Sequence, residues 1–148
     1  MSDEPHLPAW SGPFVAADRS SLRRATRLDA IDRAWAFDGG TGRGVTVAII
    51  DSGLEVDHPA LQGRVIESVA VEMRDGEPAI VKDEGVDLYG HGTACGGIVL
   101  GFAPEAELVS IRVLGPDLKG KGAAFLAGLE WAIERGCDVA NLSLSSKS

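Results

Sequence analysis

Short runs of apolar, mostly β-branched residues alternate along the chain with longer segments that have helical character. The run over residues 45–50 is typical of a strand buried inside a parallel sheet, and further strands are predicted over residues 65–73, 108–114 and 139–144. Apolar residues at helical spacing predict amphipathic helices over 27–37 and 122–135, and the small apolar residues of 92–100 predict a buried helix. Residues 79–81 are expected to pair with the second strand as a hairpin. This alternation predicts an α/β fold with a mainly parallel sheet.

The beginning of the chain differs from the rest. Residues 1–20 contain three prolines and show no periodicity. We therefore expect residues 1–26 to be an N-terminal arm and residues 27–148 to belong to a single domain, since 148 residues correspond to about one domain at most. The first residues carry neither the basic nor the apolar part of a secretory signal, which favours a cytoplasmic protein.

Composition narrows the classes of protein further. Hydrophobic residues make up 45 % of the chain and charged residues 24 %, as in an ordinary globular domain. The sequence has no apolar run long enough to span a membrane. Its net charge of −8 argues against a nucleic-acid partner. Cys95 and Cys137 are too few for a disulfide framework, so two reduced thiols are expected.

Two residues are candidates for a catalytic role. Asp51 follows an apolar strand, and ligands and catalysts of open α/β sheets gather at the carboxyl ends of strands. His91 opens a predicted helix and is a candidate general base, because its unperturbed pKa is near neutrality. A histidine that simply packs in the core remains the commoner alternative. His91 and Cys95 are four residues apart, but zinc needs three or four ligands. No second cluster is evident, so neither a metal nor another cofactor is expected.

Several motifs resemble those of the subtilisin-like serine proteases (subtilases, peptidase family S8). The aspartate motif is matched by residues 48–53 with His58-Pro59 after it, and the histidine motif by residues 90–98. Residues 103–108, 128–133 and 138–144 match later family segments in the right order. The resemblance begins near Leu28 and implies a three-layer fold around a mainly parallel sheet. It also implies hydrolysis of peptide bonds by an Asp-His-Ser triad, with Asp51 as the orienting acid and His91 as the general base.

The resemblance further implies where a peptide or protein substrate binds. One backbone edge is Lys119-Gly120-Lys121-Gly122 and the other is Ser143-Leu144-Ser145. A peptide would lie between them as an added strand. The family usually has glycine where Ser145 stands, so the preference of the primary pocket is open. Val99-Leu100 continues directly into Gly101-Phe102, and Ala60 replaces a carboxylate, so the family's calcium site is not expected.

The serine of the triad is not recognised in this sequence. The family places it in a Gly-Thr-Ser context far beyond the histidine motif, and no serine here has that context. We therefore expect the N-terminal half of a catalytic domain, incomplete at its C-terminal side and inactive alone. A truncated chain, one half of a split protease that binds the missing half, and a non-catalytic peptide-binding module remain open. A phosphoacceptor receiver domain is a weaker alternative, because its acidic pair and its later lysine are not found.

Overall fold

The computed structural model describes residues 39–143. The predicted arm over 1–26, the predicted helix over 27–37, and Leu144 and Ser145 lie outside this range. The boundary between the arm and the domain therefore stays a prediction.

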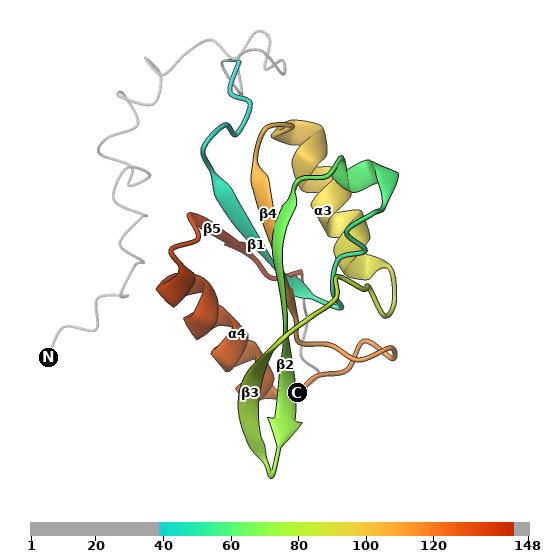
Figure 1. Cartoon of the computed structure of the whole chain (residues 1–148), viewed down its shortest axis with the longest axis vertical. Coiled ribbons are helices and arrows are strands. Elements are labelled where there is room, and N and C mark those ends of the chain that lie inside the picture. Colours follow the sequence, from blue (N-terminus) through green and yellow to red (C-terminus); the bar gives the residue numbers. More distant parts are fainter. Residues whose placement is uncertain (1–38, 144–148) are drawn as a thin grey trace, which may run out of the picture. The chain divides into compact units, whose positions relative to one another are not determined.

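A five-stranded sheet forms the centre of the described residues (Figure 1). Its strands are β1 (Thr46–Asp51), β2 (Val65–Arg74), β3 (Glu77–Lys82), β4 (Glu107–Arg112) and β5 (Val139–Asn141). Their order across the sheet is β3-β2-β4-β1-β5. β1 runs parallel to β4 and β5, β2 runs parallel to β4, and β3 is antiparallel to β2. The predicted mainly parallel sheet and the predicted hairpin are confirmed.

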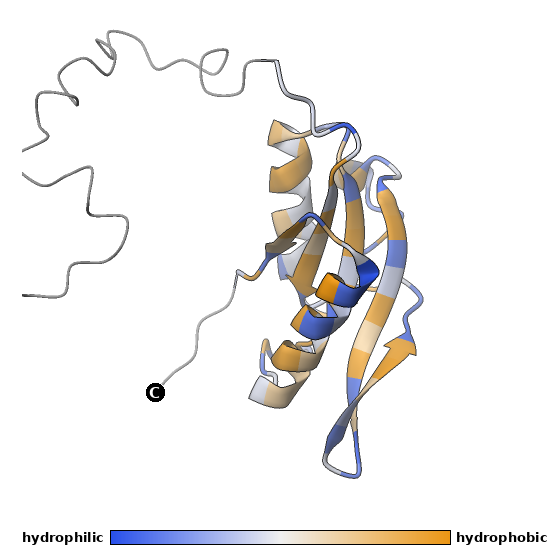
Figure 2. Cartoon of the chain, turned by 90° about the vertical axis from the view of Figure 1, so that its left-hand side faces the viewer, coloured by the Kyte–Doolittle hydropathy of each residue, from blue (hydrophilic) through white to orange (hydrophobic). Residues whose placement is uncertain are grey.

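Two helices cover opposite faces of this sheet. They are α3 (His91–Phe102) and α4 (Gly122–Arg135), and a short 3-10 helix, η3 (Pro59–Leu61), packs near α3. The alternation of side chains along β1 shows the two faces: Val47 and Ile49 belong to the apolar cluster with Leu100 of α3. Ala48 and Ile50 belong to the cluster with residues of α4. In Figure 2 the central strands are mostly hydrophobic, whereas α4 alternates between hydrophobic and hydrophilic turns. Three layers therefore result, as the family resemblance implied.

The helices differ in how closely they approach the sheet. α3 lies against the turn after β1, where a Cβ on Gly92 would be 2.1 Å from the carbonyl oxygen of Gly53. The helix predicted to be buried is buried on one side only among the described residues: Leu100 is 1 % exposed, whereas Ile98 is 63 % exposed. α4 is amphipathic as predicted, and it ends at Gly136, whose φ of 79° suits a left-handed C-cap.

Two strands end earlier than the apolar runs that predicted them. β4 ends at Arg112, because the next two amides, those of Val113 and Leu114, both donate hydrogen bonds to the carbonyl oxygen of Asp51. β5 has only three residues, which among residues 39–143 pair with β1 alone. Val139 of β5 is 48 % exposed, so an apolar run predicts a strand here without predicting its burial. Within residues 39–143, no helix has the length and apolar character that crossing a membrane requires.

Candidate active site

Asp51 is the last residue of β1, and its side chain is fully buried. Its carbonyl oxygen accepts hydrogen bonds from the amides of Val113 and Leu114, which fixes the main chain at this point. Its carboxylate Oδ1 accepts a hydrogen bond of 2.7 Å from the amide of Ser52. Burying a carboxylate without partners costs a great deal of free energy. The turn after β1 therefore supplies one of the donors that Asp51 needs.

His91, the first residue of α3, supplies the other donor. Its Nδ1 lies 2.8 Å from Oδ1 and 2.9 Å from Oδ2 of Asp51. An ionised carboxylate can only accept hydrogen bonds, so Nδ1 carries the proton and Nε2 is the basic nitrogen. The His91 side chain is 38 % exposed, whereas that of Asp51 is 0 % exposed. An imidazole held in this tautomer can take a proton from a hydroxyl group through Nε2. The structure thus brings together the two residues that the sequence singled out.

Cys95 lies one helical turn after His91, with Sγ 4.0 Å from Nδ1. Ligand atoms of Asp51, His91 and Cys95 all lie within 4.8 Å of one another. The sequence had suggested only the two residues His91 and Cys95 as potential ligands, because it could not show that Asp51 joins them. The Nδ1 atom nearest the thiol is the atom that faces Asp51, so a metal bound there would compete with the Asp51–His91 pair.

The second thiol is on the other side of the sheet. Cys95 packs against the apolar cluster under α3, and Cys137 packs against the cluster under α4. Both thiols are free. Burial raises the pKa of the Cys137 thiol. The sheet therefore separates the two cysteines, as expected for two reduced thiols.

Asp87 organises the loop that leads into α3, and sequence reasoning missed it. Its Oδ1 accepts hydrogen bonds from the Ser52 hydroxyl at 2.8 Å, the Tyr89 amide at 3.0 Å and the Gly90 amide at 2.7 Å. Its Oδ2 accepts from the amide of Thr93 at 2.8 Å and from its hydroxyl at 2.6 Å. Partial burial pushes the pKa of Asp87 upward, but the bonds from Thr93, Gly90 and Tyr89 outweigh this and lower it to about 2.

The same contacts cap α3. The N-cap residue, Gly90, has a φ of 97° and no side chain that could accept a hydrogen bond. The Thr93 amide donates to Asp87 instead, and the Gly92 amide donates to Ser52 Oγ at 3.2 Å. The first amides of a helix have no acceptor within the helix. A helix predicted to start after glycine therefore needs an outside acceptor, and an aspartate three residues earlier was the available signal.

Residues 67–87 contain seven acidic side chains, and four of these residues are exposed. Asp83 is an exception, because it is buried and its carboxylate accepts a hydrogen bond of 2.9 Å from Arg112. Asp87 is another exception, for the reasons given above. Composition could not separate these two carboxylates from their exposed neighbours.

The predicted substrate edges leave the sheet at the same end as Asp51. Lys119, Gly120 and Lys121 belong to the loop between β4 and α4, and Gly122 is the first residue of α4. Ser143 follows β5 and is exposed. Parallel strands place their carboxyl ends at one edge, and Arg112 is the register partner of Asp51. Nothing in the described residues joins these edges to His91 directly, so their role in binding stays a prediction.

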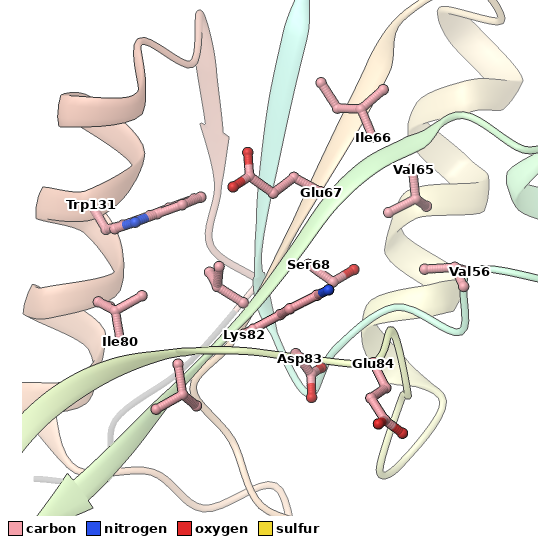
Figure 3. Close-up of a pocket in the computed structure, with 12 residues that line it drawn as sticks. Val56, Val65, Ile66, Glu67, Ser68, Ile80, Lys82, Asp83, Glu84 and Trp131 are labelled. Carbon is pink, nitrogen blue, oxygen red and sulfur yellow. The ribbon is translucent and has the colours of Figure 1, made fainter.

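Two surface hollows differ in their relation to the Asp51–His91 pair. The larger, of about 620 Å³, lies between β2, the end of β3 and α4, where Trp131 faces it (Figure 3). It includes neither member of the pair. A smaller hollow of about 450 Å³ is lined in part by Gly90 and Thr93, which flank His91 in the chain. Neither Asp51 nor His91 lines this hollow either, so it differs from the larger one only in being lined by residues next to His91 in the chain.

His58 makes a structural contact. It is the N-cap of η3, and its Nδ1 accepts a hydrogen bond of 3.2 Å from the amide of Ala60. Its ring therefore helps to start the short helix that packs against α3.

Comparison with known proteins agrees with this fold and site. The sequence model of the subtilase family (peptidase S8) matches residues 42–148. The chain therefore belongs to the subtilase family, a family of serine proteases.

Individual relatives are of the same kind. The chain is 42 % identical over 119 residues to subtilisin BL of Lederbergia lenta, covering 74 % of this chain and 40 % of that protein. It is 38 % identical over 113 residues to an intracellular serine protease of Paenibacillus polymyxa, covering 70 % of this chain and 33 % of that protein. A solved structure of a cold-adapted subtilisin-like serine proteinase superimposes with a TM-score of 0.57 at 28 % identity, covering 74 % of this chain and 40 % of the other. The chain thus spans less than half the length of these relatives.

Proposed function

We propose that these residues supply the acid and the base of a serine endopeptidase that hydrolyses peptide bonds. The observation that carries the proposal is the contact of both Asp51 carboxylate oxygens with Nδ1 of His91, at 2.8 and 2.9 Å. Among the described residues, the polar contacts of the His91 ring all involve Nδ1. Nε2 is then left to accept the proton of a nucleophilic hydroxyl.

The nucleophile in this proposal lies outside the 148 residues. No serine of the sequence stands in a Gly-Thr-Ser context. We infer that the serine and the oxyanion-hole amide come from another part of the polypeptide or from a partner chain that completes the domain. Without both groups, the covalent step and the stabilisation of its anionic intermediate are lost.

The substrate in this proposal is an extended peptide. The main chain of 119–122 would pair with one side of it, and the segment that begins at Ser143 with the other. Backbone hydrogen bonds of this kind provide affinity without strong sequence preference.

Expression of the complete reading frame that contains these residues tests the proposal. We expect casein hydrolysis and labelling of a serine by a fluorophosphonate probe, both abolished by His91→Ala. A matched control is His58→Ala, which removes a histidine with a structural contact. The 148-residue chain alone should show neither activity.

Two results would contradict the proposal. Labelling of a serine within the 148 residues, lost in His91→Ala, would place the nucleophile inside them. Retention of a bound peptide without cleavage by the complete protein would favour a non-catalytic peptide-binding module of the same fold.

A further inference from the structure

The two members of the pair belong to different segments, which must be held together accurately. Asp51 ends β1, and His91 begins α3 forty residues later in the chain. Side chains that act together in catalysis must be held close to one geometry, since small displacements are expensive. Hydrogen bonds at Asp87 join the turn after β1 to the first turn of α3.

We propose that Asp87 is the positioning residue of the Asp51–His91 pair, because its carboxylate ties the turn after β1 to the first turn of α3. This role in catalysis rests on the function proposed above, whereas the contacts themselves do not depend on it. Asp87 touches neither Asp51 nor the ring of His91 in any hydrogen bond of the described residues, so it acts through other groups.

The tie is made by two hydroxyl groups that cross between the segments. Ser52, in the turn, donates to Asp87 Oδ1 and accepts from the Gly92 amide of the helix. Thr93, in the helix, donates to Asp87 Oδ2 and accepts from the Glu55 amide at 3.0 Å, beyond the turn. Each segment therefore contributes one hydroxyl and one amide to the connection.

The charge of Asp87 gives these hydroxyls their direction. An ionised carboxylate can only accept, so both hydroxyls must point their protons toward it. Their lone pairs are then directed to the two amides of the opposite segments. With a pKa of about 2, Asp87 keeps its charge throughout the neutral range. In Asp87→Asn the NH₂ group of the carboxamide would face at least one hydrogen-bond donor. The hydrogen bonds on that side of the connection would then be reversed or broken.

The backbone leaves little room for adjustment if the connection is lost. A Cβ on Gly92 would lie 2.1 Å from the Gly53 carbonyl oxygen and 3.2 Å from Cβ of Asp51. The Leu88 amide also donates to the carbonyl of Ser52 at 3.1 Å. A change at Asp87 is thus transmitted to the turn that carries Asp51 and to the helix start that carries His91.

NMR of the 148-residue chain tests the proposal without activity. Two-bond ¹H–¹⁵N spectra of ¹⁵N-histidine-labelled protein report which ring nitrogen of each histidine carries the proton. We expect the Nδ1–H form at His91 in the wild type. In Asp87→Asn we expect this form to be partly or fully lost to the Nε2–H form. His58 is an internal reference, because its Nδ1 accepts from Ala60 in a separate contact.

The control variant is Asp83→Asn. Asp83 is a buried aspartate that pairs with Arg112 and makes no contact with Ser52 or Thr93. We expect it to lower the melting temperature but to keep the Nδ1–H form of His91. The spectra of the two variants are recorded at temperatures where the same fraction of each protein is unfolded. A similar tautomer change in both would show general loosening and would overturn the proposal.

A second variant keeps the test decisive if Asp87→Asn does not fold. Ser52→Ala removes one of the two crossing hydroxyls and should shift His91 in the same direction, by a smaller amount. An unchanged His91 tautomer in Ser52→Ala or in folded Asp87→Asn would overturn the positioning role. Absence of the Nδ1–H form in the wild type would instead overturn the Asp51–His91 geometry itself, and with it the function proposed above.

The complete enzyme provides a kinetic readout. Because a displacement of about 1 Å costs roughly 10²-fold in rate, Asp87→Asn should lower kcat by about that factor and leave KM nearly unchanged. Asp83→Asn should preserve kcat at temperatures where it is folded. An increase of KM at constant kcat in Asp87→Asn would assign Asp87 to substrate binding and would overturn the positioning role.

Discussion

The turn that carries Asp51 and the loop that carries Lys119 both lie at the carboxyl end of the sheet, yet they are held in opposite ways. The side chain of Asp51 is 0 % exposed and is held by donors from the adjoining turn and from α3. The side chain of Lys119 is 83 % exposed, and its ion pair is with Asp117, two residues earlier. Proton transfer needs fixed side chains, whereas peptide pairing uses the main chain. The difference therefore separates a part of the site that depends on side-chain geometry from a part that depends on backbone shape.

The largest effect is expected from a substitution that disrupts only the part of the site that depends on side-chain geometry. In the complete enzyme, Asp51→Asn should lower kcat by about 10⁴-fold, the loss known for this exchange in another triad protease. The amide cannot hold the Nδ1–H tautomer of His91, and it cannot stabilise the imidazolium. Steady-state kinetics on a peptide substrate measure this. An effect confined to KM would show that Asp51 is not the partner of the base.

The next prediction tests the close approach of the turn and α3. Gly92→Ala should lower the free energy of unfolding by about 3 kcal/mol, because its Cβ would overlap the Gly53 carbonyl. Urea unfolding followed by circular dichroism measures the change.

Gly101→Ala is the matched control in the same helix. An added Cβ there meets nothing within 4 Å, so alanine should be neutral or stabilising by up to about 1 kcal/mol. Equal losses in the two variants would mean that helix sequence, rather than contact with the turn, sets the stability.

A smaller effect is expected in the exposed loop, where the backbone and not the side chains is constrained. A Cβ on Gly120 would lie 2.6 Å from the Val113 carbonyl oxygen and 3.1 Å from the ring of Phe125. Gly120→Ala should therefore cost about 1–2 kcal/mol of stability and raise KM in the complete enzyme. Gly122→Ala, with nothing within 4 Å of the added Cβ, should leave the stability unchanged. A fall in kcat with unchanged KM in Gly120→Ala would place this loop with the catalytic part.

The smallest expected effect is a change in the stability contribution of Asp87 at low pH. The pKa of Asp87 is lowered to about 2 in the folded chain from an ordinary value of 3.8. A lowered folded pKa means that the contribution is fully present above the ordinary value and is lost as the pH falls toward 2. The stability difference between the wild type and Asp87→Asn should therefore shrink between about pH 4 and pH 2. A difference that is constant over this range would show that the charge of Asp87 is not responsible.

The sequence predicted the layers well because both faces of the sheet are buried. Apolar runs marked β1, β2 and β4, and Gly136 marked the end of α4 at the correct residue. The motifs singled out Asp51 and His91, which the structure brings within 2.8 Å.

What sequence reasoning missed depends on contacts between distant segments. Only its place three residues before Gly90 distinguishes Asp87 from the other acids of 67–87, and its importance comes from contacts with the distant Ser52 and with Thr93. The short length of β5 also could not be foreseen, since it follows from its register with Val47–Ile49. Periodicity reports burial along one segment, whereas these features arise where segments meet.

The separation of the two thiols by the sheet has a practical consequence. Cys95 packs with the layer of α3 and Cys137 with the layer of α4. A thiol-reactive mass tag would therefore record the opening of each layer separately in one molecule, with no introduced cysteine. If the layers open together, both sites become modified at one rate. If the layer that carries His91 opens first, Cys95 is tagged while Cys137 is still protected.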